Sequence, residues 1–262
     1  MMLPAENDDE DDDLDGRTDD VSLEPTDAAD PKTLVEKKVP QDIRSRFEVY
    51  SYRNAAVILR DAHGGEFEEL MTALRGFSIT TQMIRMPGGN ESKIPPVLSK
   101  ALRPKGWHET IIQGDLKVTR KWKEPKVEKK GFDPKTSTIH RKRFLDGHKI
   151  DYVKNKVAFD LEWNSKDQTF DRDLFAFSAF AQCGVIDVGV LLTRSLSLDP
   201  VIKKLGFALN KDGTESKKLL LSKYGKSTTH MGKLLYRLNA GRNGGCPILA
   251  IGITPSCISD WT

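Results

Sequence analysis

The chain has 262 residues, with 41 Lys/Arg, 38 Asp/Glu and a net charge of +3. That length is enough for one large domain or two small ones with a sizeable core. Residues 1–40 hold fourteen Asp/Glu against four Lys/Arg, a net of −10, so residues 41–262 carry +13. A body that basic suggests a polyanionic partner, most commonly nucleic acid. A solvated lysine-rich surface would explain the same charge.

The cysteines and the hydropathy pattern exclude several classes of protein. Cys183, Cys246 and Cys257 are far apart and show no CxxC or Cys/His spacing, which argues against a zinc site and a disulfide framework. The acidic N-terminus has no apolar core of signal-peptide length, and no run approaches the roughly 18 apolar residues of a membrane helix. We therefore expect a reduced, cytoplasmic protein with no membrane partner.

The first 42 residues have the composition of a disordered acidic tail. Low hydrophobicity and dense like charge leave little apolar area to bury, so we expect residues 1–40 to be dispensable for folding. The tail either competes with DNA for the basic body or is a solvating extension. The folded part is expected to be a single domain at residues 43–262.

The elements that precede the central motif are read from periodicity and from Gly and Pro positions. Phe67, Leu70, Met71 and Leu74 recur at helical spacing and are expected to be core residues. In chain order we expect a strand at 47–52, a helix at 54–62, a helix ending near 76, a strand at 78–86, a helix at 91–102 and a strand at 116–122. The basic segment 123–146 is expected to be irregular. Its Lys and Arg suit DNA phosphates, which reward charge without demanding sequence, or belong to an ordinary surface loop.

The central motif runs from His148 to Leu174 and is predicted to be a hairpin followed by a helix. Residues 157–164 alternate strictly, which in a strand places Val157, Phe159, Leu161 and Trp163 on one face. Asp160, Glu162 and Asn164 share the other face, and the hairpin brings Asp151 beside them. Such carboxylates can hold Mg²⁺ together with water and phosphate oxygens. A half-solvated antiparallel strand would show the same alternation.

The remaining elements indicate an α/β fold. A helix at 170–183 and a continuously apolar strand at 185–193 complete a strand–helix–strand unit, right-handed by default. After it we expect a helix at 196–206, a loop at 210–216 and a buried strand at 247–253. The stretch GKSTTH precedes a helix whose core face is Met231, Leu234, Leu235 and Leu238. Ser227 or Thr228 is the natural N-cap of that helix.

Three motifs carry a resemblance to a known family. They are PKGW at 104–107, Asp151 followed by Glu162-Trp163-Asn164, and the loop GKSTTH before a late helix. Over about residues 85–255 the chain resembles type II restriction endonucleases of the BglII family, within the PD-(D/E)XK nuclease superfamily. Asn164 is one methylene shorter than the family's Gln, and the gap between Asp151 and Glu162 is two residues longer. The resemblance implies a restriction-endonuclease-like core, a mixed central β-sheet flanked by helices.

The resemblance also implies an activity, the Mg²⁺-dependent hydrolysis of phosphodiester bonds in double-stranded DNA within a restriction–modification system. Asp151 and Glu162 would be catalytic and would bind the metal, with the backbone carbonyl of Trp163 as a third ligand. The third catalytic residue, Asn164, cannot act as a base and would orient the attacking water. Glu109 is a candidate fourth residue of the site.

The residues that would contact DNA lie in two loops. Lys166 and Asp167 resemble family positions that reach the major groove, where Lys can donate to guanine and Asp can accept from cytosine. Ser227, Thr228, Thr229 and His230 lie at a helix N-terminus, where phosphates and base edges can be met. A palindromic site would require a homodimer, and a DNA methyltransferase acting on the same site is the implied companion.

Two other functions fit the same sequence. One is a sequence-nonspecific or structure-specific DNA nuclease on the same core. The other is a catalytically inactive DNA-binding protein, because Asn164 stands where most members of the wider group have Lys. Mg²⁺-dependent cutting distinguishes the two nucleases from the DNA-binding protein, and the sequence preference of that cutting distinguishes the two nucleases from each other.

Overall fold

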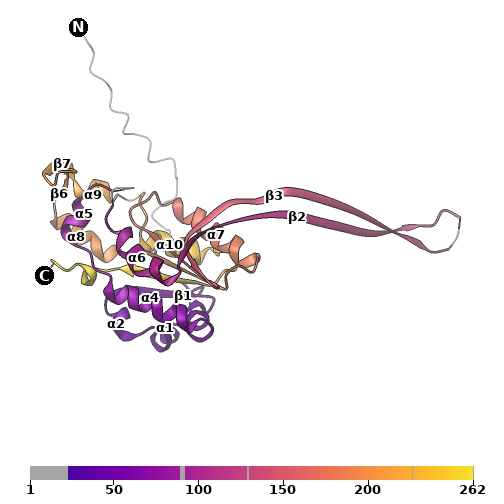
Figure 1. Ribbon diagram of the computed structural model, residues 1–262, viewed down its shortest axis with the longest axis horizontal. Coiled ribbons are helices and arrows are strands. Elements are labelled where there is room, and N and C mark those ends of the chain that lie inside the picture. The colour runs from indigo at the N-terminus through magenta and orange to yellow at the C-terminus, as the bar shows by residue number, and fades with distance from the viewer. Residues whose placement is uncertain (1–22, 89–91, 129, 226, 262) are drawn as a thin grey trace, which may run out of the picture.

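The chain folds around a mixed six-stranded sheet with helices packed on both faces, and a long two-stranded ribbon extends from it (Figure 1). This computed structural model describes residues 23–88, 92–128, 130–225 and 227–261. The order of the strands in the sheet is β1-β8-β5-β4-β3-β2. The strands are β1 (Phe47–Tyr52), β2 (His108–Pro125), β3 (Phe132–Lys154), β4 (Val157–Glu162), β5 (Val188–Arg194) and β8 (Ile248–Ile253). The predicted α/β core with a mixed central sheet is confirmed.

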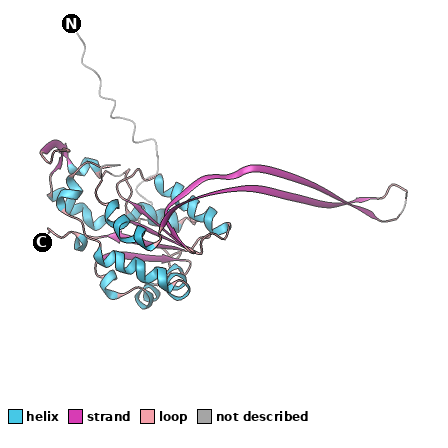
Figure 2. Cartoon of the chain, in the orientation of Figure 1, coloured by secondary structure: helices cyan, strands magenta, loops and turns pink. Residues whose placement is uncertain are grey.

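The helices and a small second sheet complete the fold (Figure 2). The N-terminal helices are α1 (Lys32–Lys38), α2 (Gln41–Arg44), α3 (Ala55–Val57), a π-helical turn (Ile58–Ala62), α4 (Gly64–Gly76), α5 (Thr81–Arg85) and α6 (Pro95–Leu102). The later helices are α7 (Thr169–Gln182), α8 (Asp199–Lys204), α9 (Leu220–Lys223) and α10 (Met231–Asn239). Short 3₁₀ turns lie at Arg103–Lys105, Leu196–Leu198 and Pro255–Cys257, and β6 (Phe207–Leu209) pairs with β7 (Glu215–Leu219). None of these described helices is long and apolar enough to cross a membrane.

The centre of the sheet is parallel, and its outer strands are antiparallel to their neighbours. β4 pairs with β5 and β5 with β8 in parallel, whereas β1 and β3 run antiparallel to the adjoining strands. The crossover from β4 to β5 passes through α7, as the strand–helix–strand prediction required. All six residues of β4 are buried, so the alternative of a half-solvated antiparallel strand is wrong. Parallel strands covered by helices on both faces are expected to be buried throughout.

Two apolar clusters lie on opposite faces of the sheet. Val157, Phe159 and Leu161 of β4 belong to one cluster, together with side chains from α1, α4 and α6. Ala158 of β4 belongs to the other, which contains the predicted core faces of α7 and α10. The face that also carries Asp160 and Glu162 is therefore covered by α7. This arrangement places the acidic residues of β4 under a helix and out of open solvent.

The predicted hairpin between β3 and β4 is confirmed. β3 ends at Lys154, β4 begins at Val157, and Tyr152 lies opposite Phe159. The two-residue connection has Asn155 at φ 48°, a left-handed conformation that Asn adopts more readily than most residues. This tight turn fixes the register that brings Asp151 next to β4.

Several element predictions were wrong. Within the segment 123–146, residues 123–125 belong to β2 and residues 132–146 to β3, and these strands pair from Leu116–Arg141 to Pro125–Phe132. Its lysines interrupt the apolar alternation that identifies a strand. The expected strand at 78–86 contains α5, because the Thr80 hydroxyl accepts the Met83 N–H and caps a helix there. Part of the expected loop at 210–216 belongs to the β6–β7 hairpin.

The folded part begins earlier than the predicted boundary at residue 43. α1 and α2 precede β1, and Val35, Val39 and Ile43 are 4%, 1% and 0% exposed. The Asp30 carboxylate accepts the Ser51 hydroxyl at 2.6 Å and so joins this segment to β1. The expectation of a disordered tail is therefore wrong for residues 23–42. Residues 1–22 lie outside the described residues.

Deleting residues 1–40 is expected to lower the free energy of unfolding by about 3–6 kcal/mol, because burying one valine contributes about 1.5–3 kcal/mol and two are removed. Denaturant unfolding of the full and shortened chains measures the difference. Glu36→Ala, at an exposed position of α1, is the control and should change stability by less than about 0.5 kcal/mol. A shortened chain as stable as the full one would restore the expectation drawn from composition.

Candidate active site

Two acidic residues from neighbouring strands meet at the start of the ribbon. The backbone N–H of Asp151 on β3 donates to Oδ1 of Asp160 on β4 at 2.8 Å. The pairing of β2 with β3 shifts register between His108 and Thr110, opposite Ile150–Val153, an irregularity that can re-aim a side chain beside a site. Asp160 is 5% exposed, and Glu162, two residues on along β4, is 9% exposed.

The crossover helix adds two charged residues that the sequence analysis missed. Nη2 of Arg172 lies 2.8 Å from Oδ1 of Asp173 and 3.4 Å from Oε1 of Glu162. Asp173 is 2% exposed. The sequence does contain a signal, since Asp173 lies three residues after Phe170 and four before Phe177. That spacing places a carboxylate on the apolar face of α7.

The four carboxylates, hereafter the carboxylate cluster, are Asp151, Asp160, Glu162 and Asp173. A cavity of about 350 Å³ opens onto three of them, and its lining is Ile111, Gly147, His148, Lys149, Asp151, Asp160, Glu162, Arg172 and Ala176. Strands β2 and β3 therefore supply one wall and α7 another. The cavity is large enough to admit a phosphate group with its water.

Glu109 does not belong to this cavity. It lies on β2 with an exposed side chain and accepts a hydrogen bond from Nζ of Lys149 at 2.9 Å. Its partner Lys149 does line the cavity, and the role of Glu109 as a fourth site residue stays a prediction. Trp107 of the PKGW motif is fully buried and donates to the Glu69 carboxylate at 2.8 Å, which makes it a packing residue next to the sheet.

Burial and mutual repulsion make the carboxylate cluster reluctant to ionise. Burial, followed by the charges of Asp173 and Asp151, raises the pKa of Asp160 well above its usual range. Burial and then the charge of Asp173 raise the pKa of Glu162 to about 8, and burial also raises the pKa of Asp173. The single guanidinium of Arg172 offsets only part of this charge. A bound cation would stabilise the ionised carboxylates.

The residues fit a divalent metal ion held by two carboxylates. No group of three or more His, Cys, Asp or Glu side chains converges on one point among the described residues. Mg²⁺, however, is commonly bound by one or two carboxylates plus water and substrate oxygens. Oδ2 of Asp173 is buried without a hydrogen-bond partner in the described part of the chain. The cluster thus combines excess negative charge with unused acceptor capacity.

Asn164 departs from the expected alternation. β4 ends at Glu162, and Asn164 has φ 59°, the left-handed region. Its side chain does not line the cavity. The Asn164 side chain lies near Gly88 instead, where its Nδ2 would be 3.9 Å from a Cβ added at that glycine. The buried Oδ1 of Asn164 has no partner among the described residues. The expectation that Asn164 shares a face with Asp160 and Glu162 is wrong, because period two requires extended backbone. Its water-orienting role stays a prediction.

The two loops predicted to contact DNA lie side by side. Lys166 and Thr228 form an isolated β-bridge, and the Asp167 N–H donates to the Ser227 carbonyl at 2.9 Å. The Thr229 N–H donates to the Ser165 carbonyl at 2.8 Å, and Thr229 Oγ1 accepts the Ser165 N–H at 3.1 Å. The chain after β4 is therefore paired directly with the loop before α10. Trp163 is buried between them and the core, 5.9 Å from the ring of Tyr224.

Within these loops, exposure separates the available side chains from the structural ones. Lys166 is exposed and Ser227 is half-buried, so both can be reached from solvent. Thr229 and His230 are 0% and 5% exposed, and burial lowers the pKa of His230 to about 3. Their predicted contacts with DNA need correction, because side chains enclosed by protein cannot reach base edges. His230 is also the N-cap residue of α10, in place of the expected Ser227 or Thr228.

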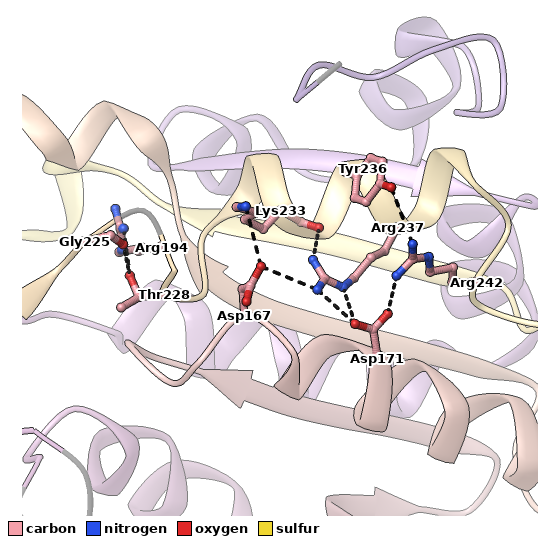
Figure 3. A network of polar contacts seen from close by, with 9 residues as sticks. All are labelled: Asp167, Asp171, Arg194, Gly225, Thr228, Lys233, Tyr236, Arg237 and Arg242. Atoms are coloured by element: carbon pink, nitrogen blue, oxygen red, sulfur yellow. Dashed lines mark hydrogen bonds and ion pairs between the residues drawn. The ribbon is translucent and has the colours of Figure 1, made fainter. Parts of the chain in front are cut away.

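A network of charged residues joins these loops to α7 and α10 (Figure 3). Arg237 of α10, 5% exposed, pairs with Asp171 at 2.9 Å and with Asp167 at 3.5 Å. Asp167 also lies 3.6 Å from Nζ of Lys233. The carboxylate predicted to accept from cytosine is thus engaged within the chain. Asp171 is the residue that precedes Arg172 of the site, so the network also holds the start of α7.

Arg194 holds the loop before α10 in place. It is 1% exposed at the end of β5 and pairs with Asp199 at 2.6 Å. Its Nη2 donates to the Tyr224 carbonyl and to the Thr228 hydroxyl, both at 3.2 Å. Thr228 in turn donates to the Gly225 carbonyl at 2.8 Å. The hydroxyl of Thr228 is therefore occupied in holding the loop.

A mixed sheet whose hairpin presents clustered carboxylates at the start of a crossover helix is consistent with a restriction-endonuclease-like fold. The family model described as restriction endonuclease BglII/BglIII matches residues 47–253. The chain belongs to this family. No curated protein sequence matches the chain.

The family membership confirms the resemblance drawn from the motifs and extends it upstream to β1. It supports a type II restriction endonuclease, that is, a DNA-cleaving hydrolase that binds DNA. Divalent-metal dependence is general among restriction endonucleases of this kind.

The raised pKa of Glu162 predicts a pH-dependent stability. A carboxyl whose pKa rises from 4.5 to about 8 on folding holds its proton more tightly in the folded state. Its ionisation therefore destabilises the fold progressively as the pH rises through that interval. In EDTA, Glu162→Gln is expected to exceed the parent in stability by about 1–3 kcal/mol above pH 8 and to match it near pH 4.

Denaturant titrations at several pH values measure this difference. Glu68→Gln, at an exposed position of α4, is the matched control and should follow the parent at every pH. A Glu162→Gln protein that is less stable than the parent above pH 8 would contradict the expectation.

Proposed function

We propose that the protein is a type II site-specific deoxyribonuclease that hydrolyses phosphodiester bonds of double-stranded DNA with Mg²⁺, as part of a restriction–modification system. The observation that carries the proposal is the carboxylate cluster, which opens onto a cavity beside Arg172 in a chain of the restriction endonuclease BglII/BglIII family. Buried acidic residues without matching cations are costly. A divalent ion held by the carboxylate cluster would offset that cost.

Asp151 and Glu162 would hold the metal, with the backbone carbonyl of Trp163 as a third ligand. Bound Mg²⁺ lowers the pKa of a water molecule and stabilises negative charge on the phosphate. Asp160 accepts the Asp151 N–H and so fixes the position of Asp151 relative to β4. Asp173 holds the guanidinium of Arg172 at 2.8 Å. Arg172 lines the cavity and is largely exposed, so its guanidinium can donate to a phosphate oxygen there.

Asn164 would orient the attacking water. Its amide has no basic group and stays neutral, so it contributes position and no charge. Its Oδ1 is buried and has no hydrogen-bond partner among the described residues. Asn164 does not line the cavity, so this role requires its side chain, at the end of β4, to turn toward the carboxylate cluster when DNA binds.

Base recognition is assigned to the paired loops after β4 and before α10. Lys166 is exposed there and Ser227 is half-buried, and Lys donates readily to guanine O6 and N7 in the major groove. Asp167 and Thr228 hold the loops in shape. A homodimer would present two copies of this surface to a palindromic site, and a cognate methyltransferase would protect the same sequence.

Incubation with unmethylated phage DNA and Mg²⁺ tests the proposal. Discrete fragments are the expected result. A continuous smear would indicate a sequence-nonspecific nuclease on the same core. Retained DNA binding without Mg²⁺-dependent cutting would indicate a DNA-binding protein without catalysis.

Asp151→Ala and Glu162→Ala are each expected to abolish cleavage while DNA binding is retained. The carboxylates act on metal and water, and their removal also relieves repulsion from the phosphate, so binding can tighten. Fragment yield in Mg²⁺ and duplex affinity in EDTA are the two measurements. Glu68→Ala is the control. Cleavage at the parent rate by both carboxylate variants would show that the hairpin is only structural.

Asn164→Ala is expected to reduce cleavage less severely and to leave measurable activity, because orienting a water contributes less than generating the hydroxide. Asn164→Lys introduces the residue that most members of the wider group carry and is the more informative variant. Single-turnover rates compare the three proteins. Complete loss of cleavage in Asn164→Ala, with an unchanged Tm, would assign Asn164 a larger role.

A further inference from the structure

The outer part of the ribbon has two chemically different faces. From Leu116 to Pro125, β2 pairs with Phe132–Arg141 of β3 in unbroken register. Directly opposed residues of an antiparallel pair lie on the same face, and the faces alternate along each strand. The stiffening face carries Leu116, Val118, Arg120, Trp122, Lys135, Ser137, Ile139 and Arg141. The lysine face carries Lys117, Thr119, Lys121, Lys123, Thr136, Thr138 and His140.

The side chains of the stiffening face contact one another. Val118 lies opposite Ile139. The guanidinium of Arg120 lies 5.4 Å from the centroid of the Trp122 ring, and its Nε donates to the Ser137 hydroxyl at 3.3 Å. Trp122 in turn donates to the Glu124 carboxylate at 2.9 Å. An isolated two-stranded hairpin is only marginally stable in water, so these pairs account for a ribbon that stands away from the body (Figure 1).

The lysine face has no comparable contacts. Among the described residues, Lys117, Lys121 and Lys123 have no hydrogen-bond or ion-pair partner. No Asp or Glu lies on this face between Lys117 and Lys123 or on the residues opposite them. At the base of the ribbon, His140 lies 3.2 Å from Asp115. These lysines alternate with threonine hydroxyls and make no polar contact with the described part of the chain. Their ammonium groups are therefore available to donate to an external acceptor.

The position and length of the ribbon match duplex DNA. Ile111, His148 and Lys149 at its base line the cavity of the carboxylate cluster, so the ribbon begins where a scissile phosphate would lie. The ten residues from Leu116 to Pro125 span about 30 Å at about 3.4 Å per residue, close to the roughly 34 Å of one turn of B-DNA. They begin five residues, or about 17 Å, beyond Ile111. The outer ribbon therefore covers the stretch from about half a turn to about one and a half turns beyond the site of cleavage.

We propose that the lysine face binds the sugar–phosphate backbone of duplex DNA flanking the cleaved site, independently of base sequence. The inference rests on the proposed function and gives the protein a second surface that contacts DNA. Lys is depleted in protein–protein interfaces, whereas Lys, Thr and Ser are common donors to phosphates. The composition of this face favours DNA over a second copy of the chain.

The test compares a triple variant, K117Q/K121Q/K123Q, with two matched controls. K117R/K121R/K123R preserves the charge of the lysine face, and R120Q/K135Q/R141Q removes three charges from the stiffening face. Affinity is measured in EDTA, by fluorescence anisotropy over a range of salt concentrations, for a long duplex of about three helical turns and a short one of about one turn.

For the long duplex, the Lys→Gln variant is expected to bind at least about tenfold more weakly at low salt, with a salt slope smaller by about 3. The Lys→Arg variant should bind like the parent, and the stiffening-face variant should keep a steeper slope than the Lys→Gln variant. The affinity difference between parent and Lys→Gln variant should shrink on the short duplex, which does not extend along the ribbon.

Different results separate the two proposals. A parent protein that binds no duplex at any salt concentration overturns the proposed function itself. A parent that binds and cuts DNA, with a Lys→Gln variant of equal affinity and slope, overturns only the role of the lysine face. Equal losses in the Lys→Gln and Lys→Arg variants would also overturn it, because phosphate binding requires charge. If the parent sediments as a dimer and the Lys→Gln variant as a monomer, the role of the lysine face in DNA binding is also overturned, because the lysines then contact a second copy of the chain.

Discussion

The site depends on one constraint, which is that several carboxyl groups are packed close together beneath α7. Asp160, Glu162 and Asp173 are each less than a tenth exposed, yet they face one another and Asp151. The peptide N–H of Asp151 supplies one compensating dipole, and Arg172 is a cation in direct contact with both Glu162 and Asp173. Because the Arg172 side chain remains 72% exposed, it compensates these charges while keeping much of its own hydration.

The constraint explains why the surroundings are so firmly tied together. Arg237 and Arg242 both pair with Asp171 at the start of α7. These pairs help to hold the neighbouring Arg172 in position. Asp167 shares Arg237 with Asp171, which places the loop after β4 in the same network. The loop before α10 is held by Arg194 and by its backbone pairing with residues 165–167. The carboxylate cluster and the loops proposed to read bases are therefore connected through β4, α7 and α10.

Periodicity in the sequence predicted the elements whose pattern is local and continuous. The β3–β4 hairpin, the core faces of α7 and α10 and the buried β5 and β8 all follow from apolar spacing and turn residues. Asp173 was missed because a single carboxylate on an apolar helix face gives no motif by itself. Asn164 was misplaced because nothing in an alternating sequence shows where the backbone turns left-handed. Thr229 and His230 are polar residues enclosed by tertiary packing, which composition cannot reveal.

The ribbon was missed because its stability comes from cross-strand pairs, and the lysines between them resemble a loop. Its shape has a kinetic consequence for an enzyme that must find one sequence among many. Phosphate contacts hold at any position along DNA, and they let a protein slide and hop along it. A ribbon that keeps such contacts while the reading loops release would leave the body tethered to the same duplex at a high local concentration. Target search would then proceed largely along one molecule, by short excursions between neighbouring positions.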